Sequence, residues 1–201
     1  LAPTLPSHWL ELSKLLQGLG RDADAFTVVR RGLLFAKEPC EALLVRAVTI
    51  AEDMGDPAKA RSFLGTLRRH DVSKVWRTVL HGAGLEARQG NLDVAATVFD
   101  HLMQNVPWYG PIYAAAFQVE FERGRMDKAR RIVSRGLKEI PRYGPLWFGR
   151  FRMEGGKYGA YEEAREKISK ELVWKVWVEE GCEWERKACA PGAGGGGGCV
   201  P

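Results

Sequence analysis

One six-residue phrase recurs along the chain at nearly constant spacing, and this repetition limits the fold more than any other feature. The phrase begins with glycine, contains an acidic residue and ends with alanine. Its glycines are spaced 35, 35, 34 and 35 residues apart, at Gly20, Gly55, Gly90, Gly124 and Gly159. A period of this length is typical of helix pairs that cannot bury their apolar faces alone and therefore stack on one another.

The phrase has the chemistry of a turn between two antiparallel helices. Glycine adopts the left-handed conformation that ends a first helix, and the acidic residue opens a second one. Asp56-Pro57 fits best, because aspartate is a good N-cap and proline is tolerated at the first helical position. The sequence therefore predicts an all-α fold, a right-handed α-solenoid of antiparallel helix pairs.

Apolar residues at helical spacing place the two helices of each pair, here called the A helix and the B helix. The A helices are expected near residues 7–18, 39–54, 73–89, 110–123, 145–155 and 173–188, and the B helices near 22–37, 57–69, 93–105, 127–139 and 160–172. The repeats would then cover about 7–38, 39–72, 73–109, 110–144 and 145–172, with a partial repeat over 173–188. We expect a single domain over 1–189 and a flexible glycine-rich tail over 190–201.

Residues 73–188 resemble half-a-tetratricopeptide (HAT) repeats, a relative of the tetratricopeptide (TPR) repeat. Trp76 followed by Glu86, and Trp147 followed by Glu154, are similar to the aromatic and acidic marks of the first HAT helix. Ala129-Arg130, echoed at residues 164–165, is similar to the start of the second helix, whereas Ala96 departs from that pattern. Proteins with such repeats are mostly concerned with RNA, so the resemblance implies a scaffold in RNA processing.

Positive charge is concentrated in one segment. Residues 121–152 contain 10 basic and 3 acidic side chains, whereas residues 1–120 contain 13 of each. Five of the cations advance by three or four residues and so share one face of a B helix, which suits a phosphate backbone or an acidic partner but is also compatible with a solvated outer face. This predicted site consists of Lys128, Arg131, Arg135, Lys138 and Arg142, flanked by Arg123, Arg125, Arg150 and Arg152.

The aromatic residues divide into two groups. Those at equivalent repeat positions are expected in the core: Trp76, Tyr113, Phe117, Phe121, Trp147, Phe151, Trp177 and Trp184. Those in or beside the turns between repeats are expected to be exposed and are the candidates for stacking on a base: Trp108, Tyr109, Tyr143 and Phe148. Glu120 and Glu154 are expected to pair with Arg130 and Arg165, because a half-buried carboxylate needs a partner.

Catalytic and cofactor signals are weak. The pattern Gly82-Ala-Gly84 is similar to a dinucleotide fingerprint, but the repeat phase places it inside an A helix with no strand beside it. The four histidines and four cysteines have no metal-ligand spacing, and Cys40 and Cys182 are expected to be buried thiols. We therefore expect no enzyme, no cofactor, no metal and no small-molecule substrate.

The leading functional expectation is a scaffold that binds other proteins of a larger complex and, through its basic face, single-stranded RNA or an acidic partner. The alternative is a protein-only adaptor without RNA contact; a receptor for chaperone tails is disfavoured, because the lysine and asparagine set that clamps a terminal carboxylate is not identified. No apolar run is long enough to cross a membrane. An intracellular location is expected, with the nucleus favoured by the resemblance and an organelle as the other choice. Because the first residue is Leu1, the chain is expected to be a processed product or a piece of a longer protein.

Overall fold

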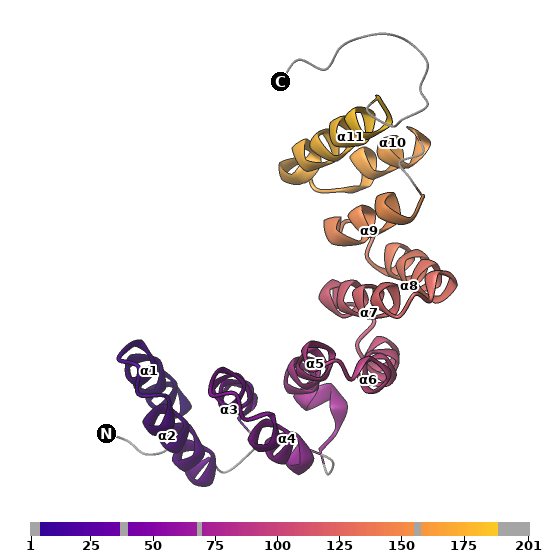
Figure 1. Cartoon of the computed structure of the whole chain (residues 1–201). Helices are drawn as coiled ribbons and strands as arrows, with labels where there is room; N and C mark the ends of the chain where they lie inside the picture. Colours follow the sequence, from indigo (N-terminus) through magenta and orange to yellow (C-terminus); the bar gives the residue numbers. More distant parts are fainter. Residues whose placement is uncertain (1–4, 37–39, 68–69, 155–157, 189–201) are drawn as a thin grey trace. The chain divides into compact units, whose positions relative to one another are not determined.

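The protein is helical throughout the part that its computed structural model describes, which is residues 5–36, 40–67, 70–154 and 158–188. Eleven α-helices and one short 3-10 helix follow one another in these ranges, and no strand interrupts them. The expected all-α solenoid of antiparallel helix pairs is confirmed (Figure 1). The tail over 190–201 lies outside the described residues.

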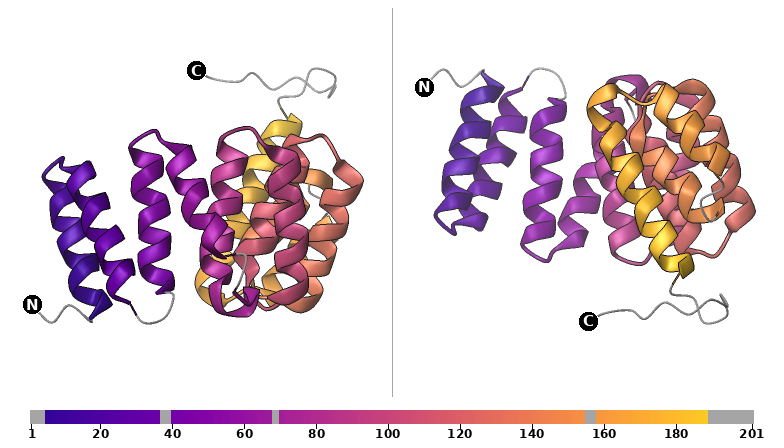
Figure 2. Two further views of the ribbon diagram at one scale, coloured as in Figure 1. Left: turned by 90° about the horizontal axis from the view of Figure 1, so that it is seen from below. Right: turned by 90° about the horizontal axis from the view of Figure 1, so that it is seen from above.

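The chain divides into two compact units, Leu1–Pro107 and Trp108–Pro201. In the first unit, A and B helices alternate along the chain and each helix packs on the next (Figure 2). Its helices are α1 (Pro6–Gly18), α2 (Asp22–Phe35), α3 (Glu41–Asp53), α4 (Pro57–Thr66), α5 (Val72–Arg88) and α6 (Leu92–Asn105). The expectation of one continuous domain over 1–189 stays a prediction.

The second unit repeats the same arrangement with the A helices α7, α9 and α11 and the B helices α8 and α10. Its elements are α7 (Gly110–Glu122), α8 (Met126–Glu139), α9 (Gly144–Glu154), α10 (Tyr158–Lys167), the 3-10 helix η2 (Lys170–Leu172) and α11 (Val173–Ala188). These bounds agree with the expected ones to within a few residues, except that α10 ends early and η2 takes the place of its last turn.

Four of the five repeated glycines end an A helix as expected. Gly20, Gly55, Gly90 and Gly124 have φ between 70° and 80°, the left-handed region that other residues avoid. Asp56 is the predicted N-cap, since its side chain accepts a hydrogen bond from the Lys59 amide at 3.0 Å. The fifth position is a correction: Gly159 lies inside α10, which begins at Tyr158.

The core of each unit lies between its A and B helices. In the first unit, Ala25 and Val29 of α2 pack against Leu43, Ala47 and Ile50 of α3, and all five are fully buried. In the second unit, Gly136 permits close contact between three helices: a Cβ at this position would lie 2.6 Å from Leu146 and 3.0 Å from the Tyr113 ring. Small residues at the crossings therefore set the helix spacing in this unit.

Helix α5 is kinked at Val75, where φ is −126° and ψ is 17°. The kink removes helical acceptors from the amides that follow it. Glu41, the first residue of α3, replaces them: its Oε1 accepts hydrogen bonds from the Arg77 amide at 2.7 Å and the Thr78 amide at 3.3 Å. Its Oε2 accepts from Arg77 Nη1 at 3.0 Å. One carboxylate thus caps a helix of the next repeat.

Replacing Glu41 with alanine is expected to lower the free energy of unfolding by about 1–2 kcal/mol, the usual cost of losing a helix cap. Urea unfolding followed by far-UV circular dichroism measures the change. Glu11, an exposed carboxylate in α1, is the matched control, and its alanine variant should unfold as the wild type does. Equal stability of the Glu41→Ala and Glu11→Ala variants would contradict the capping role.

Two further ion pairs join α5 to its neighbours in the first unit. Arg88 contacts Glu52 of α3 at 2.6 Å, and Arg61 of α4 contacts Glu86 at 2.6 Å. The Arg88 side-chain hydrogen bond holds the pKa of Glu52 below its ordinary value, and the Arg61 bond does the same for the pKa of Glu86. Both arginine side chains are more than a third exposed, so solvent screens these pairs.

These pKa shifts predict the direction of acid unfolding. A carboxylate with a lowered folded-state pKa binds protons less readily in the folded state, so its stabilisation is present above the unfolded pKa near 4.5 and is lost as the pH falls through the folded pKa. The Glu52→Gln and Glu86→Gln variants should therefore be less stable than wild type at pH 7, and the difference should shrink towards pH 3. Urea midpoints across this pH range test it, and a difference that grows at low pH would contradict it.

Candidate nucleic-acid interface and inner groove

Helix α8 presents a continuous row of cations on its outer face. Its inner face is buried through Ala129, Ile132, Val133 and Gly136. Three members of the predicted basic site lie on the other face of α8 and a fourth lies in the turn that follows the helix, and all four are exposed: Arg131, Arg135, Lys138 and Arg142. We call these four residues the basic stripe. Because α8 is a B helix, the stripe lies on the side of the helix away from its A-helix neighbours.

Three other predicted site residues are held by carboxylates of the same unit. Glu120 is 1% exposed, and its Oε1 contacts Arg123 Nη1 at 2.9 Å and Lys128 Nζ at 2.8 Å. Arg150 contacts Glu154 at 3.1 Å and Glu163 at 2.8 Å. These cations therefore serve the fold, while Arg125 and Arg152 remain exposed beside the stripe.

The expected glutamates and one of the expected arginines do form ion pairs, but their partners differ from the predicted ones. Glu120 is buried and paired, as expected, but its partners are Arg123 and Lys128, and Arg130 is exposed. Glu154 pairs with Arg150 four residues earlier. Arg165 does pair with a glutamate of the next A helix, Glu180. The i,i+3 spacing of Glu120 and Arg123 was the sequence signal that pointed to the observed pair.

Of the four aromatic residues expected to be exposed, only Trp108 is, at 62%. The other three are half-buried, which corrects the expectation for them. Tyr143 covers Gly110, where a Cβ would lie 2.6 Å from the tyrosine ring, and burial raises the pKa of its phenol. Phe148 packs on the core around Trp147 and Phe151, and the ring of Tyr109 meets that of Trp108 edge to face at 5.9 Å.

Trp108, Tyr109 and Tyr143 nevertheless gather at one end of the basic stripe. The contact of Tyr143 with Gly110 joins the beginning of α9 to the beginning of α7. Since α7 and α8 are antiparallel, the end of α8 lies beside the beginning of α7. Arg142 therefore shares this end of the unit with the exposed Trp108 ring.

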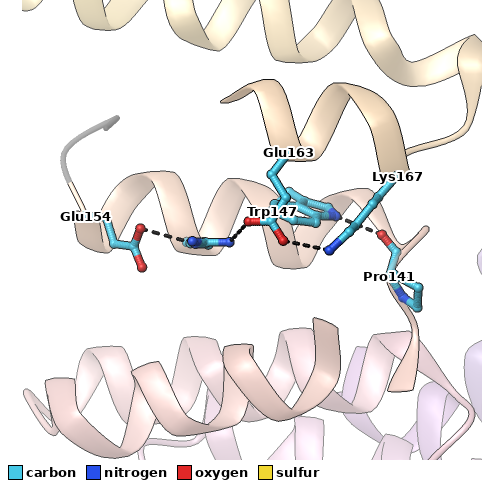
Figure 3. A network of polar contacts seen from close by, with 6 residues as sticks. Pro141, Trp147, Glu154, Glu163 and Lys167 are labelled. Atoms are coloured by element: carbon cyan, nitrogen blue, oxygen red, sulfur yellow. Dashed lines mark hydrogen bonds and ion pairs between the residues drawn. The ribbon is translucent and has the colours of Figure 1, made fainter. Parts of the chain in front are cut away.

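Beside the stripe, a groove of about 480 Å³ lies between α8, α9 and α10. Trp147 forms its floor and donates a hydrogen bond from Nε1 to the Pro141 carbonyl at 2.8 Å, as Figure 3 shows. Glu163 joins Lys167 at 2.6 Å and Arg150 at 2.8 Å, and these two cations hold the pKa of the Glu163 carboxyl below its ordinary value. Lys138 of the stripe reaches this groove, so the two features are continuous.

A second groove, of about 540 Å³, runs along the A helices α7, α9 and α11. Its walls mix rings with charges of both signs, and its lining includes Phe117, Phe148, Tyr161, Arg152, Glu179 and Arg186. We call it the inner groove. Phe148 therefore faces this groove, on the opposite side of the helix pair from the basic stripe, and does not join the other three aromatic residues.

Two core predictions fail in α11. Trp177 and Trp184 are 57% and 65% exposed, whereas Trp76, Tyr113, Phe117, Trp147 and Phe151 are buried as expected; Phe121 is half-buried. Cys182, expected to be a buried thiol, is also exposed, and Cys40 is only partly buried. Trp177 and Trp184 follow the repeat in sequence, but no helix among the described residues covers them in the way that the equivalent aromatic side chains are covered.

The glycine pattern that is similar to a dinucleotide fingerprint serves helix packing. Gly82 and Gly84 lie inside α5, as the repeat phase predicted, and a Cβ at Gly82 would lie 2.8 Å from Leu64. Within the described ranges, no group of three or more histidine, cysteine or acidic side chains is placed to hold a metal ion. No described helix combines the length and apolarity needed to cross a bilayer.

The helix pairs, their glycine turns and their spacing agree with a known family. The profile of the family described as PRP6, TPR-like domain, matches residues 1–190. The chain belongs to the PRP6 TPR-like family. The resemblance to HAT and TPR repeats is thereby confirmed, and this PRP6-family chain is a TPR-like repeat scaffold.

Relatives of this PRP6-family chain agree in fold. A TPR-containing protein of Dictyostelium discoideum is 38% identical over 185 residues, which cover 88% of this chain and 14% of that protein. The chain thus spans a small part of its relative's length. A TPR protein from Parabacteroides merdae has a TM-score of 0.60 at 15% identity, covering 91% of this chain and 73% of that one. PilF from Pseudomonas aeruginosa has a TM-score of 0.59 at 12% identity, covering 94% and 93%. These two likenesses concern the fold alone.

Proposed function

We propose that this protein is a non-catalytic scaffold of an RNA-processing complex and binds the phosphate backbone of single-stranded RNA along the basic stripe. The observation that carries the proposal is the exposed row formed by Arg131, Arg135 and Lys138 on one face of α8 and by Arg142 in the turn after it. Membership of the PRP6 family supports a role in splicing and a nuclear location. The family match and the electrostatics thus favour the same class of partner.

The stripe has the properties that a nucleic-acid backbone requires. Three of its four members are arginines, which bind phosphate oxygens through two parallel hydrogen bonds. The three members on α8 run over residues 131–138, about 10 Å along the helix at 1.5 Å per residue. The surrounding segment 121–152 carries 10 basic and 3 acidic side chains, so its field attracts polyanions. Exposed Trp108 adds a ring at the end of the row on which a base can stack.

The inner groove supports protein binding by the same scaffold. Its aromatic side chains supply apolar contact, and Arg152, Glu179 and Arg186 supply polar contacts at its edges. A groove of this kind suits a peptide segment more than a small molecule, because it is open and lined by charges of both signs. A protein-only adaptor, which uses the inner groove and leaves the stripe solvated, is the second candidate function.

Fluorescence anisotropy of a labelled single-stranded RNA tests the proposal. Wild-type protein should bind, and log K should fall with log salt concentration with a slope of about −3, because four cations displace counterions from a single strand. The variant R131E/R135E/K138E should lose at least 100-fold in affinity at low salt. Far-UV circular dichroism of this variant should match wild type, since all three side chains are exposed.

A charge-matched variant separates the stripe from net charge. R30E/R31E/K74E makes the same change in charge on exposed residues of the first unit and should bind RNA within about threefold of wild type. An equal loss of RNA affinity in both variants would mean that overall charge causes the effect and that the basic stripe is not the binding site. Absent binding by wild type at low salt would favour the protein-only adaptor.

A further inference from the structure

Helix α11 turns one carboxylate, that of Glu180, inward and three tryptophans outward. Its buried residues are Val176 and Glu180, which are 0% and 7% exposed. Its outer face carries four large apolar side chains that are all more than half exposed, Trp174, Trp177, Val178 and Trp184. We call these four residues the tryptophan stripe. A helix normally turns its apolar face to the core, so this arrangement needs a reason.

The inward face of α11 is held in place by α10. Arg165 donates to the Glu180 carboxylate, and both side chains are largely buried. The Arg165 guanidinium also stacks on the Trp177 ring, 4.1 Å from its centre. Because the ion pair and Val176 are both buried, rotating α11 to bury the tryptophans would expose a packed side chain and break this pair. The stripe is therefore a stable outward-facing feature.

The two preceding A helices show what covers this face. In α7 the buried Ile112 is followed by Tyr113, and in α9 the buried Leu146 is followed by Trp147, just as Val176 is followed by Trp177. Tyr113 is covered by the following B helix α8 at Gly136. Trp147 is covered by the following B helix α10 at Ala160 and Ala164. In each case, the occupant is an amphipathic helix with glycine or alanine at the crossing.

The size of the stripe fits one helix better than a second copy of this chain. Residues 174–184 extend about 15 Å along the axis, or three turns. Three tryptophans exposed by 57–65% offer roughly 300–450 Å² of surface. A stable dimer of ordinary size needs about 800 Å² from each partner. A patch of this size is in the range of the largest apolar patch on a typical monomer, which is often functional.

We propose that the tryptophan stripe of α11 binds an amphipathic helix of another protein, with alanine or glycine where that helix crosses Trp177. The bound helix would continue the interface that α8 forms on Tyr113 and α10 forms on Trp147. This site is distinct from the inner groove, because no residue of the tryptophan stripe lines that groove, and it is distinct from the basic stripe, which belongs to α8 and the turn after it. It would let the scaffold hold a protein helix while RNA occupies α8.

A peptide that reproduces a B helix tests the proposal. The probe has the sequence of residues 158–172, which contains no tryptophan. The peptide carries Glu166→Lys, and a side-chain lactam between Glu162 and the new amine, at two positions that are exposed in α10, holds it helical. Saturable binding to the full chain should shift the tryptophan emission to shorter wavelength. A control peptide with Ala160→Glu and Ala164→Glu should bind at least tenfold more weakly.

Variants of the protein locate the site. W174Q/W184Q should weaken probe binding at least tenfold, whereas W108Q, which replaces an exposed tryptophan of the same unit, should leave it unchanged. Circular dichroism checks that both variants remain helical. Absent binding of the probe, or equal binding by both variants, would overturn the proposal. Self-association of wild type in sedimentation that W174Q/W184Q abolishes would also overturn it, because the occupant would then be a second copy.

Discussion

Replacing Trp147 with alanine is expected to lower the free energy of unfolding by about 4 kcal/mol, the usual cost of removing a fully buried tryptophan side chain. Trp147 is 1% exposed and packs against Ala160, Tyr161 and Ala164 of α10. Truncation removes the ring that joins α9 to α10 and leaves a cavity beneath the groove between α8, α9 and α10, whose polar contacts Figure 3 shows. It also removes the hydrogen bond to the Pro141 carbonyl.

Urea unfolding followed by far-UV circular dichroism measures this loss, and two variants isolate its cause. Trp147→Phe retains most of the ring volume but lacks the indole N–H, so it should cost about 1–2 kcal/mol. Trp108→Ala removes an equally large but 62% exposed ring and should change stability by less than about 0.5 kcal/mol. Similar losses from Trp147→Ala and Trp108→Ala would show that Trp147 does not hold α9 and α10 together.

Replacing Glu120 with alanine is expected to cost about 3–5 kcal/mol, because it leaves two cations without their shared carboxylate. Arg123 and Lys128 both contact Glu120 Oε1, and their side chains are 10% and 29% exposed. Arg123 is the more heavily buried of the two, so the loss of its contact with Glu120 should dominate the effect. The pair also fixes the turn between α7 and α8, on which the position of the basic stripe depends.

Glu122, two residues further along α7, is the control for Glu120. It is exposed and accepts a hydrogen bond from the exposed Gln118 side chain at 2.7 Å, so Glu122→Ala should cost less than about 0.5 kcal/mol. The thermal midpoints of both variants at equal protein concentration check the difference. A Glu120→Ala variant as stable as Glu122→Ala would mean that the buried ion pair contributes nothing net.

The site was only partly predictable because exposure is a property of the packed unit. The spacing of the cations predicted that they share one face of a helix, and this holds for those within α8, since it depends only on helical geometry, whereas Arg142 lies beyond the end of α8. The spacing did not predict that Lys128 forms an ion pair with Glu120 of α7. Arg150 was included in the predicted basic site because of its charge, but it forms ion pairs with Glu154 and Glu163.

By itself, the sequence determined the fold class, the helix bounds and most of the core. Glycines at Gly20, Gly55, Gly90 and Gly124 end helices through their own backbone freedom, and apolar spacing selects the buried face of each helix. These signals act within a few residues, so they can be found without knowing what lies nearby. Only the tertiary structure decided that Trp177 and Trp184 are exposed, because their burial depends on a covering helix and not on their place in the repeat.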